Sequence, residues 1–334
     1  MFVSRQTGFR VVLSLLAGLS LAIFSGCGRR AERAAEYLRQ GMASAEEGRF
    51  PDALAYYDSA LAVNPRLEDA LVKKGDALAA MMRLSAALET YERALALNGR
   101  NVRAQLGKAC VLTRLESPVE AREAFERALA VAERPDSALA VRGWAEYDAH
   151  RENDARESFR LATEMNPQNK DAWVAIALLA MRTRLSNPIM MAERALPAIN
   201  RALEIDPKDR AVWTLKRAVL RGGGRFDEDL AVCDTLLALT PPDSAGWYRF
   251  RSDFTVKVGR ATVWVRRAAA LTSLGRYEES LSSFDSSLAY DPSDYRVWRL
   301  KASALEHLGR EDEVRACVEE ANRREMIQPR QGWE

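Results

Sequence analysis

The sequence predicts an all-α fold, an α-solenoid of about eight helix–turn–helix repeats. A pattern of small, aromatic and helix-ending residues recurs about every 34 residues through most of the chain. The apolar residues inside each pattern follow a three- and four-residue rhythm, which predicts amphipathic helices. The composition, 48% hydrophobic and 29% charged, is that of an ordinary helical protein without low-complexity segments. Because a solenoid grows by adding repeats, a length of 334 residues does not require several domains.

The pattern is clearest at residues 48–65. Gly48 suits the position just after a helix, where a positive φ costs little, and Pro51 suits the first turn of the following helix. Pro65 then ends this second helix. The residues between them share one helical face, with small side chains where a neighbouring helix crosses closely. In the first four repeats this face is made by Ala53, Tyr57 and Ala60; Ala87, Tyr91 and Ala94; Ala121, Phe125 and Ala128; and Ala155, Phe159 and Ala162.

The sixth repeat departs from this pattern, with Asp229 and Cys233 where the others have alanine and an aromatic residue, so its packing should differ. Later repeats add a tryptophan near the start of the first helix, at Trp173, Trp213, Trp264 and Trp298. Counted from the pattern, the repeats occupy residues 34–67, 68–101, 102–135, 136–169, 170–209, 210–243, 261–294 and 295–328.

The fifth repeat is longer than the others. Ser186, Asn187 and Pro188 read as an N-cap followed by a first-turn proline, which predicts that the second helix of this repeat starts early. Pro197 then falls inside the helix and removes one backbone hydrogen bond. We therefore predict a kink between Glu193 and Pro197.

An insertion at residues 244–260 separates the sixth and seventh repeats. Trp247, Phe250, Phe254 and Val258 are spaced three, four and four residues apart, which favours an extra amphipathic helix. The alternation from Phe254 to Val258 allows a short β-ribbon instead. The insertion is either a spacer that changes the curvature of the solenoid or a docking arm for a partner.

The spacing from Gly48 to Pro65 and its later copies resembles the tetratricopeptide repeat family, over about residues 34–328. The resemblance implies a right-handed α-solenoid whose first helices line a concave surface. It also implies a protein–protein interaction scaffold and not an enzyme.

The residues offer no catalytic, metal or cofactor site. Gly222, Gly223 and Gly224 lack the Lys-Ser/Thr that follows a phosphate-binding loop. Cysteine and histidine residues do not occur at metal-ligand spacing, so structural roles are favoured for Cys27, Cys110, Cys233, Cys317, His150 and His307. The 49 basic and 47 acidic side chains balance once Arg5 and Arg10 in the leader are set aside, which argues against nucleic-acid binding.

Residues 1–26 predict a signal peptide, because Arg5 and Arg10 precede an apolar run from Val11 to Phe24. The run rises ~21 Å, less than the ~30 Å hydrocarbon core, so a permanent membrane span is disfavoured. Ser25-Gly26-Cys27 resembles a bacterial lipobox, with Phe24 in place of the usual leucine. This resemblance implies cleavage before Cys27 and acyl chains on that residue. Gly28 after it resembles an outer-membrane sorting signal in a Gram-negative cell. An uncleaved anchor and a secreted chain remain the alternatives.

These interpretations give a domain plan. Residues 27–33 are a lipidated cysteine and a linker that reaches at most ~21 Å. Residues 34–243 are repeats one to six, 244–260 the insertion, 261–328 repeats seven and eight, and 329–334 a tail. We expect an envelope protein, anchored in the outer membrane and facing the periplasm, that binds other proteins and supports assembly of a complex. The alternative is a periplasmic receptor for a glycan or another small or polymeric ligand.

The resemblance also implies that positions 2, 5, 9, 12 and 13 of each repeat, counted from its first residue, face the concave surface. Positions 5 and 9 carry apolar residues in the central repeats, without the Lys and Asn that clamp a carboxylate in chaperone-binding family members. They predict an apolar patch that suits a helical or extended peptide, unless these side chains pack between repeats. The predicted partner-binding residues are Leu106, Cys110, Trp144, Tyr147, Val174 and Leu178, edged by Arg114, Asp148 and Arg182.

Overall fold

A computed structural model describes residues 29–182, 187–241, 247–251, 254–257 and 259–327. The chain divides after Met165 into two units of helices. Unit 1 ends with Met165 and unit 2 begins with Asn166. The described part is all-α apart from two short strands, as the repeat pattern predicted.

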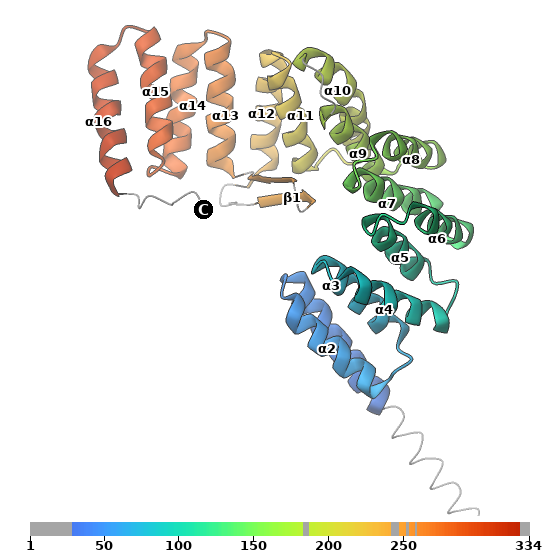
Figure 1. The fold of residues 1–334 in the computed structure, drawn as a ribbon. Coiled ribbons are helices and arrows are strands. Elements are labelled where there is room, and N and C mark those ends of the chain that lie inside the picture. The colour runs from blue at the N-terminus through green and yellow to red at the C-terminus, as the bar shows by residue number, and fades with distance from the viewer. Residues whose placement is uncertain (1–28, 183–186, 242–246, 252–253, 258, 328–334) are drawn as a thin grey trace, which may run out of the picture. The chain divides into compact units, whose positions relative to one another are not determined.

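Unit 1 is a series of helix pairs (Figure 1). The first helix of each pair packs against the second, and α3 and α7 each also contact α5, the first helix between them. Residues 29–33, expected to be a linker, are already helical, so the first helix starts earlier than the repeat count indicated. The elements are a helix containing residues 29–46, then α2 Phe50–Val63, α3 Glu68–Ala80, α4 Leu84–Leu97, α5 Val102–Arg114, α6 Pro118–Val131, α7 Pro135–Asp148 and α8 Glu152–Met165.

The contact of glycine with an aromatic ring fixes the register of these pairs. A Cβ on Gly75 would lie 2.6 Å from the Tyr91 ring, and one on Gly143 would lie 2.7 Å from the Phe159 ring. Gly41 and Tyr57 meet in the same way. The two helices of a repeat can approach this closely only where the first has no side chain. Tyr57, Tyr91 and Phe159 are at most 2% exposed, which confirms the predicted face of the second helix.

The turn between the two helices places one residue in the left-handed region. Gly48 has φ +77°, as predicted from its position after the first helix. The equivalent residues of the next three repeats are not glycine, although Met82, Glu116 and His150 have φ between 57° and 59°. These three residues hold a backbone conformation that costs a side chain about 1–2 kcal/mol.

Unit 2 continues the helix pairs with a longer second helix in the fifth repeat. The Asn187 side chain accepts a hydrogen bond from the Ile189 N–H, and Pro188 is the first helical residue, which confirms the predicted early start. The helix runs through Pro197, and the kink stays a prediction. The helices are α9 Lys170–Arg182, α10 Pro188–Ile205, α11 Arg210–Gly222, α12 Phe226–Leu239, α13 Arg260–Ser273, α14 Tyr277–Tyr290, α15 Tyr295–His307 and α16 Glu311–Ile327.

The insertion contains two strands, β1 Trp247–Arg251 and β2 Phe254–Lys257, and the favoured prediction of a helix was wrong. The strands pair antiparallel with Trp247 opposite Lys257, and the register shifts between Arg249 and Arg251. The sequence WYRFR followed by FTVK is rich in aromatic and β-branched residues, which favour strands over helices. The three- and four-residue spacing of four apolar residues was therefore a weaker signal than local β-propensity.

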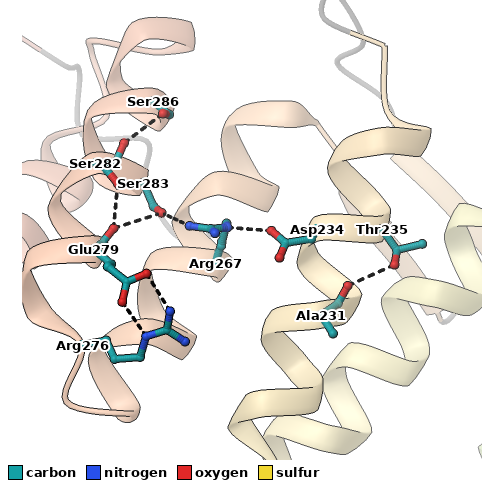
Figure 2. Close-up of polar contacts among 9 residues, drawn as sticks. All are labelled: Ala231, Asp234, Thr235, Arg267, Arg276, Glu279, Ser282, Ser283 and Ser286. Carbon is teal, nitrogen blue, oxygen red and sulfur yellow. Dashed lines mark hydrogen bonds and ion pairs between the residues drawn. The ribbon is translucent and has the colours of Figure 1, made fainter.

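Helices α12 and α13 pack together across the insertion. At three other repeat junctions a basic first-helix residue pairs with an acidic residue 16 positions earlier, as Lys108 Nζ does with Glu92 Oε1 at 2.7 Å. At this junction Arg267 Nε pairs with Asp234 Oδ1 at 2.7 Å across 33 positions, a difference equal to the 17 inserted residues. Arg267 also donates to Ser283 Oγ on α14 at 2.8 Å (Figure 2). The insertion is thus looped out of an intact stack.

Asp229 and Cys233 are both fully buried in α12, where the sequence predicted unusual packing. The Arg217 guanidinium on α11 lies 3.8 Å from the Asp229 carboxylate, too far for a hydrogen bond. Neither Asp229 oxygen has a hydrogen-bond partner, and the same holds for Arg217 Nε and Arg266 Nη1 on α13. Burial raises the pKa of Asp229 and lowers the pKa of Arg217, because both charged forms lose water. Burial also raises the pKa of the Cys233 thiol to about 12.

Candidate functional site

Six of the nine predicted binding residues lie on two adjacent helices of unit 1. Leu106, Cys110 and Arg114 belong to α5, and Trp144, Tyr147 and Asp148 belong to α7, which contacts α5. We call these six residues the unit 1 patch. The four apolar members are half-buried, so each keeps some surface for a partner. Because Gly143 meets Phe159 as Gly75 meets Tyr91, α7 has the register assumed by the sequence count, and Tyr147 is not drawn into the core.

Trp144 connects the patch to the core. Its ring lies edge-on to the Tyr147 ring, with centroids 5.6 Å apart, and edge-on to the Phe159 ring at 5.0 Å. Phe159 is fully buried, so Trp144 rests on a core residue while part of it stays exposed. Edge-to-face pairs of this kind contribute about 0.5–1.5 kcal/mol beyond the buried area. The surface at Trp144 is therefore backed by a rigid core contact.

Arg114 and Asp148, the residues expected at the edge of the patch, lie near each other. Arg114 Nη2 lies 3.9 Å from Asp148 Oδ2, and Arg114 Nη1 donates to the Ala79 carbonyl of α3 at 3.4 Å. Both charged side chains are partly exposed, so the pair contributes at most about 1 kcal/mol to stability. Arg114 thus spans the ends of three first helices and leaves both charges within reach of a ligand.

The three predicted residues of unit 2 do not extend an open apolar surface. Val174 and Leu178 on α9 are only 7% and 8% exposed, so their assignment to an open groove was wrong. Val72 and Ala140, the position-5 residues of two other repeats, are also buried, at 2% and 7% exposure. Leu106 at the same repeat position stays half-buried, so exposure at position 5 differs from one repeat to the next. Arg182, at the end of α9, is half-buried.

A pocket of about 200 Å³ lies elsewhere in unit 1, between the first two repeats. Its lining includes Met42 and Asp76, which occupy the same repeat position as Cys110 and Trp144. Tyr91 Oη donates to Asp76 Oδ1 at 2.7 Å, and burial with the nearby Asp76 charge raises the pKa of Tyr91. The repeat pattern predicted that Met42 and Asp76 occupy equivalent positions. It did not predict the pocket beside Met42, because the pocket depends on how Phe50 and Lys73 border it.

Two kinds of feature are absent from the part of the chain that the structure describes. The described residues contain no group of three or more histidine, cysteine or acidic side chains placed to hold a metal ion. They also contain no helix with the length and apolar character needed to cross a bilayer. Cys233 and Cys317 are free thiols.

Part of the chain is similar in sequence to a known repeat family. The sequence profile of the tetratricopeptide repeat matches residues 38–81, 72–138 and 265–316. No curated protein sequence matches the chain. These profile matches fall in both units, on the helix pairs α3–α4, α5–α6 and α13–α14 among others.

Several solved structures are similar. A tetratricopeptide repeat protein from Parabacteroides merdae has 16% identity and a TM-score of 0.42, with 82% of this chain and 99% of that chain covered. YrrB, described as a TPR protein with an unusual peptide-binding site, has 22% identity, a TM-score of 0.35 and coverage of 58% and 97%. PilW, a type IV pilus biogenesis factor, has 17% identity, a TM-score of 0.47 and coverage of 61% and 92%. In the residues that the profile matches, both units are therefore similar to the tetratricopeptide repeat, and these residues form helix pairs.

Proposed function

We propose that the chain is a protein–protein interaction scaffold and that the unit 1 patch binds a helical or extended segment of a partner protein. The observation that carries this proposal is the half-exposed pair Trp144 and Tyr147, which rests on buried Phe159 beside a polar edge. Binding energy concentrates on aromatic anchors of this kind, and a rigid support lowers the entropy lost when a partner docks. The half-buried Leu106 and Cys110 on α5 would extend the contact along the partner.

We further propose that the protein acts in a bacterial envelope, held to the outer membrane by acyl chains on Cys27, and supports assembly of a complex there. Ser25-Gly26-Cys27 behind a short apolar run supports this proposal. Cys27 lies outside the described residues. Two or three acyl chains on one residue would hold the protein stably, whereas one chain binds a bilayer only marginally.

The patch is tested with a photo-crosslinker at Leu106 in the native membrane, followed by identification of the captured protein. With that partner in hand, Trp144→Ala should weaken binding by about 2 kcal/mol, roughly 30-fold, as expected of an anchor residue. Trp144→Ala also removes the contact with Phe159, so some loss of stability is expected, but less than the ~3–5 kcal/mol of a fully buried aromatic.

The matched control is Trp213→Ala, which removes a half-buried tryptophan of α11 in unit 2. This variant should bind the partner as the wild type does. If both variants bind normally, the patch is not the binding site. If Trp144 instead governs the binding of cell-wall fragments measured by calorimetry, the chain is a glycan receptor and the scaffold proposal fails.

A further inference from the structure

We propose that the β1–β2 ribbon is a second binding site, which takes an extended acidic segment of a partner protein as a third strand along one open edge. This site lies in unit 2, outside the unit 1 patch, and the proposal does not depend on that patch.

The ribbon is not needed to stack the repeats. Arg260, at the start of α13, donates through Nη1 to the Leu237 and Thr240 carbonyls at the end of α12, at 3.1 and 2.6 Å. The Asp234–Arg267 pair holds the same two helices further along (Figure 2). These contacts close the base of the insertion, so the strands between them are free to serve another purpose.

The edges of the ribbon are open in the part of the chain that the structure describes. Its sheet consists of β1 and β2 alone, so each strand has one side without a neighbouring strand. Such an edge offers a row of backbone N–H and C=O groups that an added strand can pair with. An isolated two-stranded ribbon is marginally stable in water, and a third strand would stabilise it. Strand β1 contacts α11, which gives the ribbon one anchored side.

The charge of the ribbon sequence selects the partner. Strands β1 and β2 contain Arg249, Arg251 and Lys257 and no acidic residue, whereas the chain beyond its leader is balanced. An acidic strand would be attracted to this segment, and opposite charges across a pair of strands are stabilising. A second copy of the ribbon would bring like charges together, which disfavours self-pairing.

The test uses the full-length protein in detergent and a synthetic eight-residue peptide of alternating valine and glutamate. Its affinity is measured by calorimetry, and hydrogen exchange locates the site. We expect the peptide to bind at least tenfold more tightly than the same peptide with lysine in place of glutamate. N-methylation of alternate backbone amides on the side that pairs should weaken binding at least tenfold, because strand pairing needs those N–H groups. The amides of β1 and β2 should exchange more slowly in the complex.

Two protein variants complete the test. Replacement of residues 247–257 by a Gly-Ser linker should abolish binding, while amide protection of α13 stays as in the wild type. Arg249→Glu combined with Arg251→Glu should reverse the preference between the two peptides. The proposal is overturned if the linker variant binds as well as the wild type, if N-methylation has no effect, or if no peptide binds. It is also overturned if the protein forms dimers that the linker variant loses, since the ribbon would then pair with itself.

Discussion

At the scale of single residues, the turn between the two helices of a repeat depends on one residue with positive φ. Gly48, Gly224, Gly275 and Gly309 fill this position with φ between 69° and 77°. Met82, Glu116 and His150 fill it with side chains present, at φ near 58°. An L-residue in this region brings its Cβ too close to the following carbonyl oxygen. Three turns of unit 1 therefore store backbone strain that the glycine turns do not.

We predict that Glu116→Gly stabilises the protein by about 0.5–1 kcal/mol, because relief of ~1–2 kcal/mol of strain exceeds the added chain entropy of glycine. Gly48→Ala should have the opposite effect and destabilise by about 1 kcal/mol. Urea unfolding of the two variants and the wild type measures both changes. A Glu116→Gly variant less stable than the wild type would show that the turn is not strained at this position.

At the scale of elements, α12 differs from the other second helices. Asp229 occupies the place of Ala53, Ala87, Ala121 and Ala155, and all five residues are at most 2% exposed. A carboxylate at this site stays buried because the Arg217 and Arg266 guanidiniums are close enough to interact with it. The raised pKa of Asp229 and the lowered pKa of Arg217 indicate that the cost of burial exceeds the attraction between the charges.

Comparison with the other repeats alone would suggest that Asp229→Ala stabilises α12. We predict instead a loss of about 3 kcal/mol at pH 7, because the buried Arg217 and Arg266 would keep their charges without a neighbouring carboxylate. Arg217→Leu combined with Asp229→Ala should recover this loss and reach at least the stability of the wild type, since apolar groups replace a costly ion pair. Urea unfolding followed by circular dichroism measures the stability of both variants. A stabilising Asp229→Ala change would contradict this account of the cluster.

At the scale of the whole molecule, the helix that contains residues 29–46 brings the first repeat close to the predicted anchor. Residues 29–33 rise ~7.5 Å as a helix, compared with ~18 Å if they were extended. Arg29, Arg30 and Arg33 are exposed on this helix. Basic residues near an anionic membrane surface contribute about 1 kcal/mol each to binding.

We predict that the protein incorporates labelled fatty acid and fractionates with membranes, and that Cys27→Ala abolishes both. On anionic vesicles the lipidated protein should resist trypsin at Arg29 and Arg33 more than the Cys27→Ala form does. Arg66, an exposed residue in the turn after α2, is the internal control and should be cut equally in both forms. An unlabelled protein in the soluble fraction would rule out the anchor, and equal cleavage at Arg33 would rule out close membrane approach.

The sequence by itself determined the repeats. Helix ends, turn glycines and the small and aromatic faces are local or near-local features, and the Gly75–Tyr91 contact joins residues only 16 positions apart. The capped start of α10 at Asn187 and Pro188 is local too. Such features are set by backbone dihedrals and by the packing of one helix on the next, so a periodic sequence encodes them in every copy.

Only the tertiary structure decided which side chains remain exposed and how exceptions to the period are accommodated. Val174 is buried although it shares its repeat position with the half-exposed Leu106, because exposure depends on how closely neighbouring helices cover each position. The buried charges around Asp229 require contacts among three helices, and the clamp between Asp234 and Arg267 spans 33 positions. These contacts depend on distances between segments, which the repeat pattern does not give. They decide whether a side chain packs inside the protein or stays exposed to bind a partner.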